Sequence, residues 1–163
     1  MNDMHKPALP ISAPSARRAA FCAIVLLLAI AGCHSKPQTV VSMKIGNATF
    51  QLEVANTENV RMKGLMNRQS MPADHGMIFV FHDETERNFW MKDTLIPLDI
   101  IYISGDGRVV SIRQMHPLDE KTQTRSVLPA KWAIELNQGA AAKCGVSVGD
   151  QLTIPADAQD TPS

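Results

Sequence analysis

Residues 88–100 hold the side chains best suited to chemistry, because a lysine, two aspartates and two aromatic rings crowd into this short stretch. Carboxylates beside a lysine can perform acid–base catalysis, since each charge shifts the pKa of its neighbours. A hydrolase or transferase could use Asp99 with Lys92 or Asp74 in this way. The alternative is structural, with Lys92 and Asp99 forming an ion pair that pins the turn at Pro97. We favour the structural alternative and assign no catalytic residue, because no catalytic dyad or G-x-S-x-G serine is present.

Two arginines and a tryptophan are further candidates for ligand binding. Arg61 and Arg68 lie seven residues apart, on one face of a helix if the helix extends that far, and could clamp a carboxylate or phosphate. The alternative, which we favour, leaves one arginine solvated while the other pairs with Asp74 or Glu135. Trp90 could form a platform for a sugar or peptide, or belong to the core. The candidate ligand-binding residues are therefore Arg61, Arg68, Trp90, Lys92 and Asp99.

Methionine is the unusual feature of the composition. Thioethers bind Cu(I), so a periplasmic Cu(I)-binding protein is one alternative function. Metal-binding methionines usually recur as M-x-M or M-x-x-M, whereas here they lie among Phe79, Phe81, Phe89 and Trp90, where methionine fills gaps in a core. We therefore expect packing, and predict no metal site and no cofactor, since C-x-x-C, H-E-x-x-H and acidic calcium-loop motifs are absent. The methionines concerned are Met43, Met62, Met66, Met71, Met77, Met91 and Met115.

Short strands separated by tight turns dominate the rest of the pattern. Gly46-Asn47-Ala48 predicts a hairpin between residues 40–45 and 49–54, and Gly105-Asp106-Gly107 predicts a second between residues 98–103 and 108–115. Further strands are predicted at 76–81, 89–91, 132–136 and 151–154.

Two short helices are also predicted. The first is capped by Asn56 or Thr57 and ends near Asn67, and the second runs from Gly139 to Cys144. The fold class expected is a mostly β protein, namely a compact antiparallel β barrel or sandwich with one or two short helices. It occupies residues 40–155, and residues 156–163 are expected to form a flexible tail.

The first 32 residues resemble a lipoprotein signal peptide. Basic residues precede an uncharged apolar run over residues 19–31, which is short for a membrane span. The run ends in Ile30-Ala31-Gly32-Cys33, which resembles a bacterial lipobox, where cleavage precedes the cysteine and its sulfur is acylated. Residues 1–32 are then the signal peptide, Cys33 is the lipidation site, and residues 33–39 form a lipidated tether. His34 after the cysteine favours the outer membrane in a double-membraned bacterium.

The charge and the cysteine content limit which partners and which disulfides are expected. After removal of residues 1–32 the chain keeps 13 basic and 15 acidic residues, a net charge of −2, and has no basic run. Nucleic acid is therefore not expected as a partner. If Cys33 is acylated, only Cys144 remains, so no disulfide within the chain is expected and the core must be stable without one.

A series of short motifs resembles one family over nearly all of residues 40–155. They are Arg61-Met-Lys-Gly64-Leu-Met66-Asn-Arg68, Met71-Pro72, Gly76-Met77, Phe79, Phe81, Phe89-Trp-Met-Lys92, Thr94, Ile96-Pro97-Leu98-Asp99-Ile100, Asp106-Gly107, Pro129-Ala130, Glu135-Leu136, Gly139 and Gly149-Asp150. The chain resembles the bacterial and archaeal domain-of-unknown-function family 192. The resemblance implies a compact β-rich domain, often exported, with no established activity. The chain departs from the family at Asp93, where asparagine is usual.

Together these observations predict a protein of the cell envelope, lipid-anchored and facing the periplasm. Its β domain is expected to bind a small molecule, a glycan or an envelope protein without catalysis, and its contact with the membrane is through the N-terminal lipid. The hydrolase or transferase and the Cu(I)-binding protein remain the alternatives.

Overall fold

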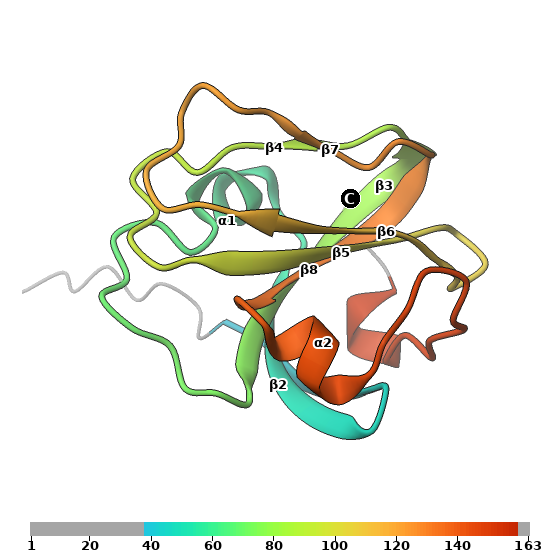
Figure 1. The fold of residues 1–163 in the computed structure, drawn as a ribbon. Coiled ribbons are helices and arrows are strands. Elements are labelled where there is room, and N and C mark those ends of the chain that lie inside the picture. The colour runs from blue at the N-terminus through green and yellow to red at the C-terminus, as the bar shows by residue number, and fades with distance from the viewer. Residues whose placement is uncertain (1–37, 160–163) are drawn as a thin grey trace, which may run out of the picture. The chain divides into compact units, whose positions relative to one another are not determined.

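Six strands form one mixed sheet in the order β1-β2-β3-β8-β5-β6, shown in Figure 1. This computed structural model describes residues 38–159. The predicted signal peptide and Cys33 lie outside the described residues. The strands of the sheet are β1 (Val40–Ile45), β2 (Ala48–Ala55), β3 (His75–Thr85), β8 (Ala130–Asn137), β5 (Leu98–Ile103) and β6 (Val109–Met115).

Smaller elements complete the fold. The strands β4 (Asn88–Phe89) and β7 (Thr124–Arg125) pair with each other in a separate ribbon. The helices are α1 (Glu58–Lys63), α2 (Ala140–Cys144) and the 3-10 helix η1 (Ala156–Ala158). The described part of the chain contains no helix that is both long and apolar enough to cross a membrane.

The prediction of a mostly β domain with two short helices is confirmed, but the expected barrel or sandwich is not. Within residues 38–159 the sheet stays open, with β1 and β6 at its edges. Strands β2 and β3 are parallel, and the other neighbours in the sheet are antiparallel. Parallel neighbours need a crossover connection, which here runs through α1. The alternation of apolar and polar residues cannot reveal this pairing, because parallel and antiparallel strands bury the same faces.

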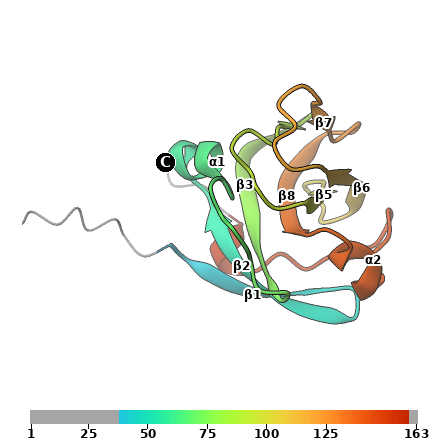
Figure 2. The same ribbon diagram turned by 60° about the vertical axis from the view of Figure 1, so that its left-hand side comes forward.

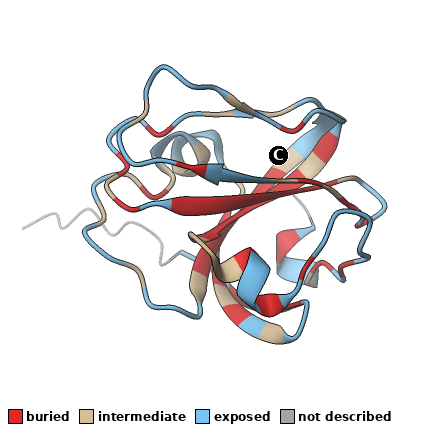
Figure 3. Cartoon of the chain, in the orientation of Figure 1, coloured by how far each residue is buried: buried red, intermediate tan, exposed pale blue. Residues whose placement is uncertain are grey.

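Each face of the sheet carries its own apolar cluster, and Figure 3 shows β5 buried along its whole length. One face, called here the closed face, includes Met43, Leu52, Ile78, Ile101 and Ile134. The other, called the pocket face, includes Met77, Phe79, Ile100, Tyr102 and Ala133. Side chains alternate between the faces along each strand, as the pleat requires.

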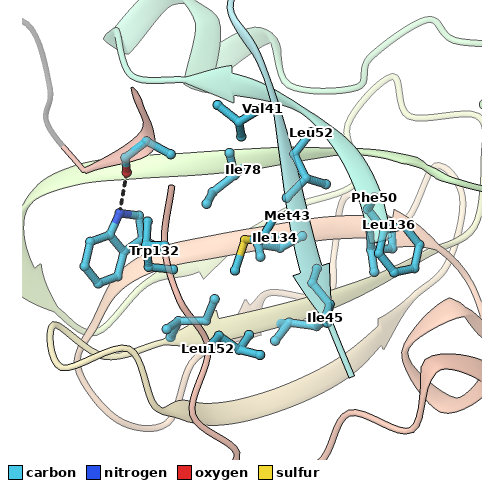
Figure 4. Packing of buried hydrophobic residues seen from close by; sticks show 14 of the residues in the cluster. Val41, Met43, Ile45, Phe50, Leu52, Ile78, Trp132, Ile134, Leu136 and Leu152 are labelled. Atoms are coloured by element: carbon cyan, nitrogen blue, oxygen red, sulfur yellow. Dashed lines mark hydrogen bonds between the residues drawn. The ribbon is translucent and has the colours of Figure 1, made fainter. Parts of the chain in front are cut away.

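The closed face is covered by α2 and by the C-terminal part of the described chain. Figure 4 shows its packing, with Trp132 Nε1 donating a 2.8 Å hydrogen bond to the carbonyl oxygen of Ala158. Ala158 is buried, so the beginning of the expected flexible tail is instead the ordered 3-10 helix η1. Leu152 and Ile154 also pack on this face rather than forming the predicted strand over 151–154, where only Gln151 makes a β-bridge, to Arg108.

The pocket face is covered by α1, the β4–β7 ribbon and the loop that follows β4. In Figure 1 the ribbon and α2 lie on opposite sides of β5 and β6, and Figure 2 shows α1 beside β3 from a second direction. Helix α1 contributes no fully buried residue, although Leu65 directly after it is buried in the pocket-face cluster. Cover by a short helix and a two-residue ribbon leaves space above the sheet.

Candidate functional site

The space on the pocket face is a partly open pocket of about 400 Å³. It lies between the end of α1, strand β3 and the segment that begins at β4. Its large apolar walls are Leu65, Met66, Phe79, Phe81, Phe89 and Trp90. Its polar and charged residues are Glu58, Arg61, Lys63, Asn88, Thr94 and Glu135. A concave site that combines apolar and aromatic walls with polar groups is a common form of small-molecule site.

Aromatic rings packed edge to face build the inner wall. The ring of Phe89 lies 4.9 Å from that of Phe79, 6.3 Å from that of Phe81 and 5.8 Å from that of Tyr102, measured between centroids. Such T-shaped contacts hold rings in fixed orientations. Trp90 follows Phe89 directly and is 46% exposed, so it forms the part of the wall at the mouth of the pocket.

The turn at the end of α1 forms another side of the pocket. Thr57 caps the helix, with its hydroxyl accepting a 3.4 Å hydrogen bond from the Val60 amide. Gly64 ends the helix at a φ of 47° and lines the pocket, in a backbone conformation that residues with a side chain rarely adopt. Arg61 reaches from the helix to β3, donating a 2.9 Å hydrogen bond from Nη1 to the carbonyl oxygen of Val80.

Glu135 is the most unusual residue in the pocket. It lies on the central strand β8 between Met77 of β3 and Ile100 of β5, and it is only 5% exposed. Among residues 38–159 no side chain or backbone group donates a hydrogen bond to its carboxyl group. Burial raises the pKa of Glu135 to about 8, against the opposing effect of the Arg68 charge. The group is therefore mostly a neutral acid at pH 7, with an unused O–H donor.

The structure distributes the five predicted ligand-binding residues over different places. Arg61 and Trp90 line the pocket, and the Lys92 ammonium lies 5.6 Å from the centre of the Trp90 ring, beside the mouth. Arg68 is engaged elsewhere on the pocket face, pairing with both carboxylate oxygens of Glu53 at 2.5 and 2.7 Å. This pair corrects the sequence-based expectation that Arg61 or Arg68 pairs with Asp74 or Glu135.

Asp99 lies on the closed face and is 2% exposed. Its Oδ2 accepts a 3.0 Å hydrogen bond from the Ala141 amide at the start of α2. The described residues show no ion pair between Asp99 and Lys92, and the Lys92 side chain is exposed. The expected ion pair at the Pro97 turn is therefore wrong. Asp74 bonds instead to its neighbour His75 at 2.8 Å, so the residues of the hydrolase alternative do not share one site.

The methionines contribute mainly to packing. Met43 is buried in the closed-face cluster, whereas Met77, Met91 and Met115 are buried in the pocket-face cluster. Met62 is 57% exposed at the edge of the pocket. The described residues also contain no group of three or more His, Cys, Asp or Glu side chains placed to hold a metal ion.

Sequence reasoning missed Glu135 as a site residue. Its signal was available, because Trp132-Ala-Ile-Glu-Leu136 places one carboxylate inside an otherwise apolar strand. A charged residue at an inward position of such a strand is rare unless it is paired or functional.

These observations define a class of protein: a small β domain with an open mixed sheet and a ligand-sized pocket on one face. The chain belongs to the DUF192 family, described as an uncharacterized ACR, whose model matches residues 40–154. The comparison with curated proteins gave no match.

Two crystal structures resemble the domain, each with 33% sequence identity and a TM-score of 0.64. One is a protein from Sinorhizobium meliloti 1021 proposed to be a transcription regulator, and the match covers 70% of this chain and 91% of that one. The other is a protein of unknown function from Novosphingobium aromaticivorans, with 72% and 85% covered.

Proposed function

We propose that this domain is a non-catalytic binding module, and that the pocket beside α1 takes a small, largely apolar organic molecule. The observation that carries the proposal is Glu135, a buried carboxyl group without an internal partner that lines an aromatic cavity. A buried polar group is normally hydrogen-bonded. Glu135 lines the pocket, so a molecule bound there would supply the partner that the described residues do not.

Binding is favoured over catalysis by the arrangement of the reactive groups. The carboxylate of Asp99 lies on the opposite face of the sheet and is already hydrogen-bonded to Ala141. Within the described pocket, the Thr94 hydroxyl donates to the carbonyl oxygen of Lys92 at 3.1 Å, and no side chain pairs with it as a base. Nucleophilic catalysis requires a base within hydrogen-bonding distance of the nucleophile.

Calorimetry of the purified full-length protein with 3-phenylpropan-1-ol, a neutral probe, tests the pocket. We expect saturable binding that is abolished by Met66→Trp, because the larger side chain fills the cavity. Val148→Trp is the matched control, since Val148 is 61% exposed and does not line the pocket. Absence of binding, or equal loss in both variants, would contradict the proposal.

We propose further that the protein acts at the cell envelope, anchored by lipid at Cys33 and facing the periplasm. The support is the sequence Ile30-Ala31-Gly32-Cys33 after an apolar run. Two or more acyl chains give a stable anchor, so the domain needs no membrane-binding surface. Cys33→Ser should abolish labelling by a fatty-acid analogue and release the protein from the membrane fraction. Labelling that persists in this variant would contradict the anchor.

A further inference from the structure

We propose that the pocket selects organic carboxylates, with the apolar body of the ligand on the aromatic wall and its carboxylate accepting hydrogen bonds from Glu135 and Arg61. This inference rests on the proposed binding function and adds the chemical class of the ligand.

The charges around the pocket favour an anion. Arg61 and Lys63 line it together with Glu58, which is its only lining acidic residue besides Glu135, and Lys92 lies beside the mouth over Trp90. Arg87 also lies near, 4.0 Å from the centre of the Phe81 ring, but its charge is paired with Asp83 at 2.9 Å. Cations thus outnumber anions at the entrance, and a negatively charged ligand is attracted to it.

Most N–H donors of Arg61 form no hydrogen bond to the described residues. Its guanidinium group carries five N–H donors, and among the described residues only Nη1 is used, in the bond to the Val80 carbonyl oxygen. The group lies 5.5 Å from the centre of the Phe81 ring, beside the apolar wall. Burial lowers the pKa of Arg61, although Glu58 opposes this effect and the group stays protonated at neutral pH. A carboxylate matches the planar fork of its remaining donors.

Glu135 completes the site as a neutral acid. Arg68 faces it, but the Arg68 nitrogens Nη1 and Nη2 donate their hydrogen bonds to Glu53. Tyr102 also faces it, and that hydroxyl donates to the carbonyl oxygen of Thr124 at 2.7 Å. Neither group therefore occupies the Glu135 carboxyl, whose O–H is left to donate to the ligand. Hydrogen bonds from an acid to a carboxylate are among the short, strong class.

An amine ligand would require the opposite state of the site. It would bind to ionised Glu135, and its charge would be repelled by Arg61 and Lys63. The two ligand classes therefore predict opposite dependence on pH. Carboxylate binding weakens as Glu135 ionises near pH 8, and amine binding strengthens.

Calorimetric titration of the full-length protein with 3-phenylpropionate, 3-phenylpropan-1-ol and 3-phenylpropylamine separates these cases. At pH 6.5 we expect the acid to bind about tenfold more tightly than the alcohol, as for one charge-assisted contact, and the amine to bind most weakly. Raising the pH to 9 should weaken binding of the acid in the wild type. Glu135→Gln should retain the preference for the acid and lose this pH dependence, because the amide stays a neutral donor.

Arg61→Gln identifies the second contact. We expect it to reduce binding of the acid about tenfold while binding of the alcohol is retained, which also reports that the pocket is folded. Equal binding of all three probes, or tightest binding of the amine, would overturn the carboxylate inference and leave the pocket intact. Failure of all three probes to bind would instead overturn the proposed function itself.

Discussion

The two faces of the sheet each bury one carboxyl group, and the two groups differ in their hydrogen bonding. Asp99 on the closed face receives the amide of Ala141, whereas Glu135 on the pocket face receives no hydrogen bond from the described residues. They lie on adjacent strands, since Ile100, which follows Asp99, pairs with Glu135. Burial is nearly equal, at 2% and 5% exposure. Burial alone therefore does not separate these two carboxyl groups, whereas their hydrogen-bond partners do.

The difference follows from what covers each face. On the closed face α2 brings a backbone amide directly to the carboxylate, which satisfies one of the free N–H groups at the start of a helix. On the pocket face α1 is only six residues long and buries none of them, and the ribbon β4–β7 is only two residues long on each side. The cover thus supplies a hydrogen-bond partner to Asp99 and leaves a pocket beside Glu135.

The largest expected effect is the pH dependence that Glu135 confers on stability. An unfolded glutamate ionises near pH 4.5, whereas the folded group keeps its proton up to about pH 8. Between these values the unfolded chain releases a proton that the folded chain retains, so the free energy of unfolding falls as pH rises. The loss is on the order of 4 kcal/mol, and it levels off above pH 8.

Urea unfolding at pH 5, 6.5 and 8 measures this slope, and Glu135→Gln should flatten it. Asp74, Asp83, Asp106 and Asp119 do not interfere, because hydrogen bonds lower their pKa values and place their titration below the window. A slope that survives in the variant would show that Glu135 is not the buried acid responsible.

The second prediction tests whether the pocket face is loosely packed beyond the pocket. Met77 on this face and Met43 on the closed face are 1% and 2% exposed. Substitution of either by alanine should lower the free energy of unfolding by about 3 kcal/mol, through lost burial and a cavity. Met62→Ala is the control and should change it by less than about 0.5 kcal/mol. A much smaller cost at Met77 than at Met43 would mean that the whole pocket face is loose.

A smaller effect is expected from Asp99→Ala. The substitution leaves the Ala141 amide without its acceptor and should cost about 2 kcal/mol, as is typical of an unsatisfied buried group. Asp99→Asn should cost less, because the amide oxygen can still accept the bond. Urea denaturation of both variants measures the difference. Equal losses in the two would indicate that the charge of Asp99, rather than its position as an acceptor, stabilises α2.

The smallest effect is expected at Lys92. Its side chain is exposed and contacts the Trp90 ring rather than Asp99. Lys92→Met should therefore change the free energy of unfolding by less than about 0.5 kcal/mol. A loss of stability comparable to that of Asp99→Ala would indicate that Lys92 and Asp99 do form an ion pair, and would contradict the structural description.

Local elements of the fold could be predicted from the sequence, and their arrangement could not. Gly46 and Gly107 predict hairpins because glycine readily adopts the positive φ that tight turns need. The structure shows φ values of 56° and 88° at these two residues. The parallel pairing of β2 with β3, and the position of β8 between β3 and β5, involve strands far apart in the chain. Alternation of side chains is the same for either neighbour, so it carries no information about these pairings.

The residues of the candidate site were likewise predictable only in part. Arg61 and Trp90 were recognised from their side-chain types, and both line the pocket. Asp99 and Arg68 have equally suggestive types, but their partners Ala141 and Glu53 are distant in sequence and could not be inferred from it. A side chain alone does not show whether the fold already supplies its partner.

The departure at Asp93 has a simple structural account. Its backbone adopts a φ of 52°, and its carbonyl oxygen accepts a 2.7 Å hydrogen bond from the Asn67 amide. Aspartate and asparagine both tolerate this left-handed conformation better than most residues. The position therefore requires a backbone shape that either residue supplies, which explains why the exchange is compatible with the fold.

The place of β8 in the sheet also determines the order in which the chain can be assembled. Strands β1 to β3 lie on one side of β8, and the hairpin of β5 and β6 lies on the other. Both parts precede β8 in the chain, and without β8 the edges of β3 and β5 that pair with it would be left without a partner. They join only when residues 130–137 arrive. Folding dominated by such distant contacts is slow, so we expect the joining of the two parts by β8 to limit the rate at which the sheet forms.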